Sequence, residues 1–141
     1  MTPIRQQIQT NLVALISLLV ALTALGYTAW RQEQTEDNRT LRVAAFSMLQ
    51  TAGELQSVVD FAHYDDDLKA GNPIKGWGKV LYLRDLGIIM PPSVQTNTQY
   101  LQNTWAQNWG AMHQDEAAAQ RITQAIESLR AEVRALLVSL Q

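Results

Sequence analysis

The chain has 141 residues and no cysteine, so disulfides, thiolate nucleophiles and cysteine metal sites are excluded. Two of the eleven Lys and Arg residues precede Gln32, so the rest of the chain carries nine against thirteen Asp and Glu, a net charge of −4. No basic patch is evident, and we therefore expect no nucleic-acid partner. The length suits one membrane anchor and one domain of about 110 residues.

The first predicted element is a helix through the uncharged segment from Asn11 to Trp30. A helix rises about 1.5 Å per residue, so about 20 apolar residues cross the roughly 30 Å hydrocarbon core of a bilayer. Six leucines, two valines and Ile16 lie between Leu12 and Leu25. Trp30 followed by Arg31 is typical of a membrane interface. We predict a short polar tail over residues 1–10 and a transmembrane anchor over residues 11–30.

A cleaved signal peptide is the alternative interpretation of the same segment. Arg5 precedes the apolar run, and Ala24-Leu25-Gly26 resembles a small-x-small cleavage site. The apolar run is, however, longer than the 7–15 residues or so of a typical signal peptide. Neither Gly nor Pro occurs between Gly26 and Gly53, so no turn separates a leader from the rest of the chain. We therefore favour an anchor that is retained.

The charge distribution and the position of the anchor give opposite orientations. Arg31, Arg39 and Arg42 lie after the anchor, whereas only Arg5 and the α-amino group precede it, which favours a cytoplasmic domain. A short tail before a single apolar helix generally acts as a signal-anchor and exports the domain on its C-terminal side. We favour a periplasmic domain on a bacterial inner membrane.

The anchor is predicted to continue as one long helix over about residues 11–63. The segment RQEQTEDNRT, residues 31–40, has no apolar residue and no helix breaker, so it is predicted to be a polar helical stalk. After it, apolar residues recur at intervals of four and three, as in a helix that packs at small crossing angles. These residues are Leu41, Ala45, Met48, Ala52, Leu55, Val59 and Ala62.

Two further helices are expected between the breaker residues of HYDDDLKAGNPIKGW and those near Gly110. The first is short and amphipathic, with Trp77, Val80, Leu81 and Leu83 buried. Pro91 and Pro92 end it, and Ser93 is expected to cap the next helix. That helix places heptad-like residues on one side, namely Val94, Leu101, Trp105 and Met112.

A last helix is expected to start near Asp115 and Glu116, because acidic residues suit a helix N-terminus. Its apolar residues are Ile122, Ile126, Leu129, Val133, Leu136 and Leu140. No segment alternates like a strand. The predicted fold class is all-α: an N-terminal transmembrane helix continues into a small, mostly antiparallel helical bundle, residues 41–141, of three long helices and one short helix.

An acidic turn at the end of the first long helix raises the question of a metal site. His63 lies close to Asp60, Asp65, Asp66 and Asp67, and imidazole and carboxylate ligands suit divalent ions. The spacing does not match an EF-hand loop, which needs further acidic ligands and a central glycine. We predict a solvated turn without a bound metal, in which one aspartate caps the short helix.

No catalytic motif is found in the sequence. His113 is the only other histidine, and the chain lacks G-x-S-x-G, H-E-x-x-H and a Gly-rich phosphate loop. We expect no enzymatic activity and no cofactor.

The tryptophans and neighbouring side chains are candidates for binding a partner. Trp105 keeps the phase of Leu101 and is assigned to the core, whereas Trp109 lies beside that row. Trp77 follows a turn and is the better candidate for an exposed aromatic. The candidate partner-binding residues are Trp77, Tyr64, Asp65, Asp66 and Asp67.

Small residues form a stripe along the anchor, at positions where they allow transmembrane helices to pack closely. These candidate helix-packing residues are Ala14, Ser17, Ala21, Ala24 and Thr28. The same residues are also common filler in such helices, so the stripe alone does not establish association.

Two functions agree with this organisation. The first is a non-enzymatic, single-pass membrane protein whose helical domain is an accessory, scaffold or interaction module for a membrane partner, with the lipid bilayer and a protein partner or a second copy as its contacts. The second is a helical bundle that senses a small ligand or stress. A polar-lined cavity would favour the second, and a dry core with an exposed apolar patch the first.

Overall fold

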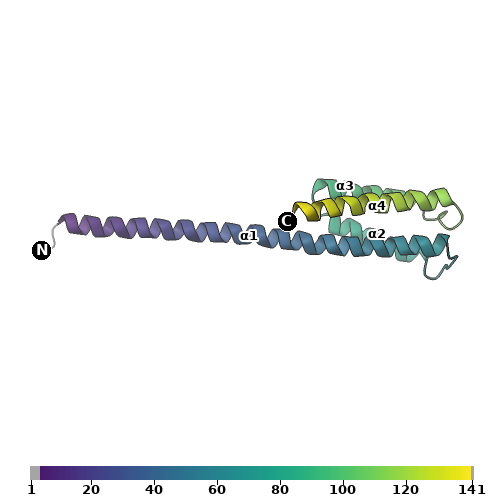
Figure 1. The fold of residues 1–141 in the computed structure, drawn as a ribbon, viewed down its shortest axis with the longest axis horizontal. Coiled ribbons are helices and arrows are strands. Elements are labelled where there is room, and N and C mark those ends of the chain that lie inside the picture. Colours follow the sequence, from purple (N-terminus) through teal and green to yellow (C-terminus); the bar gives the residue numbers. More distant parts are fainter. Residues whose placement is uncertain (1–3, 141) are drawn as a thin grey trace. The chain divides into compact units, whose positions relative to one another are not determined.

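The structure, a computed structural model, describes residues 4–140, with the side chains of residues 11–140 apart from Gln34. It contains four helices, α1 (Ile4–His63), α2 (Pro73–Gly87), α3 (Pro92–Asn108) and α4 (Glu116–Ser139), which Figure 1 shows in sequence colours. No strand occurs within residues 4–140, so the predicted all-α class is confirmed. The chain divides into two compact units, Met1–Arg39 and Thr40–Gln141, and the second is called the helical unit below.

In the first unit, α1 presents its apolar side chains to the surroundings. Leu15, Leu19 and Leu25 are each more than 60% exposed, and no residue of the apolar window is buried within the described chain. This helix is long and apolar enough to cross a membrane. The predicted helix over residues 11–63 is confirmed at its C-terminal end, and its N-terminal end lies earlier, at Ile4.

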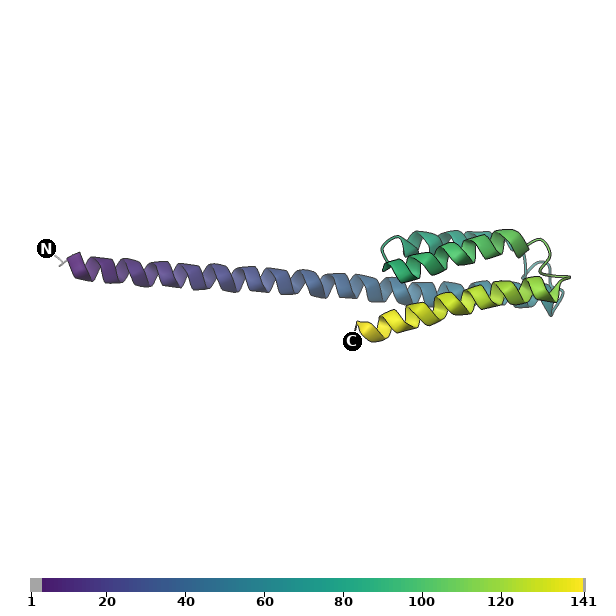
Figure 2. The same ribbon diagram turned by 90° about the horizontal axis from the view of Figure 1, so that it is seen from above.

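The helical unit has a core to which all four helices contribute. Figures 1 and 2 show the last part of α1 lying beside α2, α3 and α4 in both views. The largest fully buried side chain is that of Trp105, and Met48, Leu55, Leu101 and Ile122 are also fully buried. A core of this kind removes apolar surface from water, which is the main favourable contribution to folding.

The apolar row predicted for α1 faces this core. Ala45, Met48, Leu55 and Val59 are at most 1% exposed, whereas Leu41 is half-buried where the helical unit begins. Spacing of four and three residues keeps these side chains on one side of a helix, and the structure confirms that this side is buried.

The length of α2 and the residue that caps it differ from the prediction. The helix begins at Pro73 and has 15 residues, close to the 17 of α3, so it is not a single short helix among long ones. Asn72 caps it by accepting a hydrogen bond from the Ile74 N–H at 2.9 Å, so the prediction of an aspartate cap is wrong. Proline fits the first helical position because its missing N–H has no partner there in any helix.

The start of α3 also differs, while that of α4 agrees with the prediction. Ser93 does not cap α3, which begins one residue earlier, at Pro92, after Pro91. The side chain of Asp115 accepts a hydrogen bond from the Ala117 N–H at 2.9 Å and caps α4. A carboxylate is doubly suited to this position, because it accepts an unpaired N–H and opposes the positive end of the helix dipole.

Leu81, predicted to be buried in α2, is instead 43% exposed. The buried positions of this helix are Gly76, Val80, Leu83 and Gly87, at intervals of four, three and four. Leu81 follows Val80 by one residue and therefore points about 100° away from the buried side. Two of the four buried positions are glycines, which a search for apolar side chains does not count.

Candidate functional site

The loop between α1 and α2, residues 64–72, holds the predicted acidic turn. The side chain of Asp67 accepts hydrogen bonds from the backbone N–H groups of Lys69 and Ala70, each at 2.9 Å. These bonds, with that from Ala70 the stronger cause, hold the pKa of the Asp67 carboxyl below its ordinary value. Asp67 therefore organises the loop through its own backbone.

The two other aspartates of the turn, Asp65 and Asp66, are exposed. Asp66 has a φ of 50°, a left-handed conformation that Asp and Asn tolerate better than other residues with a Cβ. Among the residues that the structure describes, no three His, Asp or Glu side chains gather as a metal site would require. The expectation of no metal stays a prediction.

His63 ties this loop to the one between α3 and α4. Its Nδ1 lies 2.9 Å from the backbone carbonyl oxygen of Met112, and because a carbonyl only accepts, Nδ1 is the donor. The ring also meets the ring of Tyr64 edge to face, with centroids 4.7 Å apart. Tyr64 itself is 70% exposed. The two loops therefore lie together at one end of the helical unit, and the hydrogen bond of His63 joins it to a backbone carbonyl rather than to His113.

A small apolar pocket, called the loop pocket, lies where these two loops meet. It has a volume of about 260 Å³. Leu68 and Trp109 are its exposed apolar side chains, at 65% and 40%, and His113 adds a polar group. The remaining lining residues are Ala62, Gly71, Pro73, Gly110 and Met112. Sequence reasoning missed Leu68, because a single leucine within an acidic, helix-breaking segment carries no periodic signal.

Trp105 is buried as predicted, but the exposed tryptophan of the helical unit is not the predicted Trp77. Trp105 is fully buried, as predicted. Trp77 is half-buried against the core and meets Trp105 edge to face, with ring centroids 6.5 Å apart. Within the helical unit Trp109, rather than Trp77, is therefore the exposed indole. Whether any of these side chains binds a partner remains a prediction.

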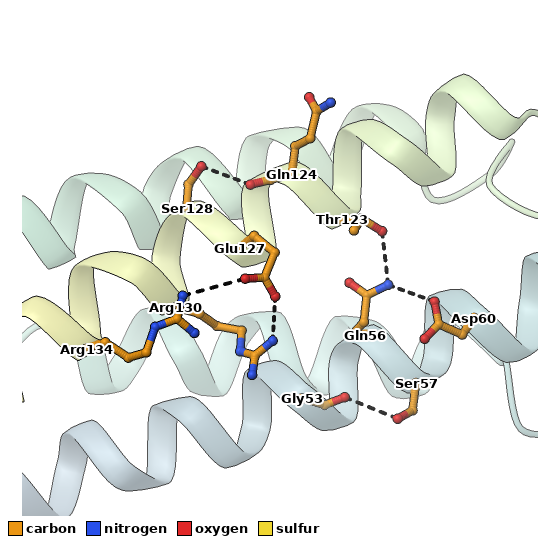
Figure 3. Close-up of polar contacts among 10 residues, drawn as sticks. All are labelled: Gly53, Gln56, Ser57, Asp60, Thr123, Gln124, Glu127, Ser128, Arg130 and Arg134. Carbon is orange, nitrogen blue, oxygen red and sulfur yellow. Dashed lines mark hydrogen bonds and ion pairs between the residues drawn. The ribbon is translucent and has the colours of Figure 1, made fainter.

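Polar side chains form contacts within α1, within α4 and, at one point, between the two helices (Figure 3). The Nε2 group of Gln56 donates to Asp60 Oδ1 at 2.8 Å and to Thr123 Oγ1 at 3.0 Å. Glu127 forms an ion pair with Arg130 and, at 3.7 Å, with Arg134. The Gln56 Oε1 atom is buried without a hydrogen-bond partner among the described residues. Of these contacts, the bond from Gln56 to Thr123 joins α1 to α4, whereas Glu127, Arg130 and Arg134 all belong to α4.

The small-residue stripe predicted for the anchor lies exposed along α1. Ala14, Ser17, Ala21 and Ala24 are all exposed, as is Thr28. The Thr28 hydroxyl donates to the carbonyl oxygen of Ala24 at 2.8 Å, so the helix itself satisfies this polar group. Helix–helix association through the stripe remains a prediction.

Comparison with known proteins identifies no relative of the chain. No family model matches the chain, and neither a curated protein nor a solved structure is significantly similar to it. The candidate sites therefore rest on the geometry of the chain itself.

Proposed function

We propose that the protein is a non-enzymatic, single-pass membrane protein whose helical unit is an interaction module for a protein partner. The observation that carries the proposal is the exposure of the apolar side chains between Leu12 and Trp30. A buried core helix of a soluble protein would hide these side chains, whereas none of this window is buried in the described chain. Exposed apolar surface on this scale indicates contact with lipid or with another protein.

The continuity of α1 supports an anchor over a cleaved leader. Gly26, the end of the possible cleavage motif, lies inside α1, and cleavage there would cut a helix that runs on to His63. The hydroxyls of Thr23 and Thr28 donate to the carbonyl oxygens four residues earlier, at 2.8 Å each. A helix with its polar groups satisfied internally is the kind of segment that remains stable in a bilayer.

The helical unit is proposed to be an antiparallel bundle. Three contacts between α1 and the α4 side support this: His63 with Met112, Gln56 with Thr123, and Arg42 with the carbonyl oxygen of Leu140. As the first residue number falls, the second rises by a similar amount, which is the pattern of antiparallel neighbours. Short connections between successive helices also favour antiparallel packing.

We further propose that the anchor lies in a bacterial inner membrane with the helical unit in the periplasm. A single apolar span ahead of a polar domain agrees with a signal-anchor that exports the helical unit, whereas the bias of Arg31, Arg39 and Arg42 opposes it. An alkaline phosphatase fused after Gln141 reports the side of the membrane. We expect an active fusion, and an inactive fusion whose cytoplasmic fluorescent counterpart is bright would reverse the orientation.

Sensing of a small ligand is the second candidate, and the loop pocket with Trp109 and His113 is the observation that favours it. Its volume of about 260 Å³ is smaller than most ligand sites, which occupy roughly 300–1,000 Å³, and a larger groove of about 560 Å³ between α2 and α3 is open rather than enclosed. The core next to it is filled by apolar side chains such as Met112 and Ala62. The interaction module therefore has the stronger support.

Two experiments test the proposed function. Alkaline washing of membranes should leave the full chain in the pellet, whereas Leu18→Arg with Leu22→Arg should release it, because each central arginine costs about 3 kcal/mol on insertion. Gln32→Arg, outside the apolar segment, is the matched control and should remain in the pellet. Release of the unaltered chain would overturn the anchor.

The interaction role is tested by affinity capture of the full chain from its native membranes in mild detergent. We expect a protein partner in fixed stoichiometry. Recovery of the chain as a monomer and without any other protein, at a detergent concentration that preserves known membrane complexes, would contradict the accessory role.

A further inference from the structure

The exposed side of α3 differs in charge from the rest of the helical unit. From Leu86 to Gln114 the chain contains no Asp, Glu, Lys or Arg. The exposed side of α4, by contrast, carries Glu116, Arg121, Glu127 and Arg134. A long uncharged stretch is expected in a buried segment, yet α3 exposes many polar side chains, so burial within the chain does not explain it.

Three amide side chains form a row along the exposed side of α3. Gln95, Gln99 and Asn103 are four residues apart, which places them one above the other on a helix. The Nε2 group of Gln99 donates to Asn103 Oδ1 at 3.2 Å, and that of Gln95 donates to the carbonyl oxygen of Met90 at 2.8 Å. These bonds hold the amides in a defined arrangement. The row is called the amide row below.

The amide row borders an open groove between α2 and α3, with a volume of about 560 Å³. The two helices lie close beside it, since a Cβ on Gly87 would stand 2.7 Å from Thr98 Oγ1. Apolar and aromatic side chains flank the row, with Ile88 70% exposed and Tyr100 53% exposed. Arg84 of α2 also lines the groove and is the charged side chain among its lining residues. The centres of protein interfaces are likewise poor in charge and rich in aromatic side chains, with polar side chains at the rim.

We propose that the exposed side of α3 binds the same side of a second copy of the chain, so that the two amide rows lie against each other in a two-fold symmetric dimer. A surface that meets itself must be self-complementary. An amide carries both donors and acceptors, so a row of amides can pair with its own copy, whereas a row of like charges cannot. The absence of charged side chains from Leu86 to Gln114 thus has a direct role in this interface.

Membrane anchoring strengthens such a dimer, and in this respect the inference rests on the proposed function. Two anchored copies diffuse in one plane, and confinement of this kind raises their effective concentration. The face itself borders an open groove and exposes polar side chains, which fits a reversible contact. The dimer names one partner for the interaction module, namely a second copy.

A charge placed in the amide row tests the interface. In a two-fold dimer Gln99→Glu brings two carboxylates together, and we expect the dissociation constant to rise by about tenfold or more. Gln124→Glu is the matched control, since Figure 3 shows the Gln124 side chain pointing away from α1 on the exposed side of α4. Sedimentation of the full chain in mild detergent should give a dimer for the unaltered protein and for Gln124→Glu, and a monomer for Gln99→Glu.

The natural absence of cysteine allows a second measurement in native membranes. Single cysteines at Gln95, Gln99 and Asn103 should give disulfide-linked dimers on oxidation, because bridged Cα atoms lie within about 7 Å. Gln124→Cys should not. A monomeric unaltered chain, a dimer that tolerates Gln99→Glu, or equal cross-linking through Gln124→Cys would overturn the dimer.

The experiments distinguish failure of the dimer from failure of the proposed membrane anchor. A chain that stays in the membrane on alkaline washing but is monomeric overturns the dimer and leaves the anchor intact. Adducts of Gln99→Cys with a protein of another size, without linked dimers, would assign the face to a different partner and also overturn the dimer. A chain released by alkaline washing contradicts the anchor, whatever its oligomeric state.

Discussion

The indole ring of Trp105 lies against the backbone of Gly76. A Cβ added to Gly76 would stand 2.2 Å from the Cη2 and Cζ2 atoms of Trp105, far inside van der Waals contact. Gly76 and Trp105 are both buried, and α2 and α3 approach each other through this pair. The largest core side chain therefore fits only because its neighbour has no side chain.

We expect Gly76→Ala to destabilise the helical unit by about 1–3 kcal/mol, because overpacking forces a core ring or the backbone to move. Gly78→Ala is the control in the same helix, since nothing lies within 4 Å of its added Cβ. The control should stabilise by up to about 1 kcal/mol through helix propensity. Urea unfolding of the full chain in mild detergent, followed by tryptophan fluorescence, measures both. Equal effects of the two substitutions would show that α2 and α3 are not in close contact.

Trp105→Ala should destabilise the helical unit by about 3–5 kcal/mol, since it removes the largest buried side chain and leaves a cavity. That loss is a large part of the roughly 5–15 kcal/mol available to a domain. Trp109→Ala, at a 40% exposed position, should cost far less. Circular dichroism and thermal melting of the two variants give the comparison. A Trp105→Ala variant that melts like the unaltered protein would remove Trp105 from the core.

The hydrogen bonds of the Asp67 carboxyl predict that the stability of the helical unit depends on pH. The pKa of its carboxyl is lowered in the folded chain by hydrogen bonds from the Ala70 and Lys69 N–H groups. Its contribution to stability is therefore present above the unfolded pKa of about 3.9 and is lost as pH falls through the lower folded pKa. Urea midpoints between pH 5 and pH 3 should fall less steeply for Asp67→Asn than for the unaltered chain. Asp65→Asn is the control, and a matching change there would assign the effect to the general charge of the turn.

The left-handed backbone conformation of Asp66 predicts how substitutions at this position change stability. With a φ of 50°, Asp66→Asn should leave stability nearly unchanged, while Asp66→Val should cost about 1–2 kcal/mol. Arg39→Ala, on the exposed part of α1 before the helical unit, should change stability by only tenths of a kcal/mol. Thermal melts rank the three variants. A valine variant as stable as the asparagine variant would contradict the left-handed conformation.

The long-range contacts explain why sequence reasoning finds the helices but not the sites. The period of Ala45, Met48 and Leu55 lies within one helix, so it can be read along the chain. The contact of Gly76 with Trp105 joins residues from different helices, and a single sequence holds no signal for such a pair. The starts of α2 and α3 are mispredicted because proline is treated only as a residue that ends helices. Pro73 and Pro92 instead each lie in the first turn of a helix.

The candidate surfaces fail to appear in the sequence for a related reason. A search for charged, aromatic or apolar patterns passes over Gln95, Gln99 and Asn103, because uncharged amides have no periodic signal of their own. Their role depends on exposure and on the neighbouring α2, which only the fold determines. The loop pocket similarly depends on two loops that are far apart in the sequence.

Retention of the segment from Leu12 to Trp30 is the central claim, and the intact mass of the protein in its native membrane tests it most directly. We expect the intact mass of the purified membrane-bound chain to include the residues before Gly26, and its digest to contain peptides from that segment. A mature chain that begins at Tyr27, with no upstream peptide in the membrane fraction, would contradict retention of the anchor.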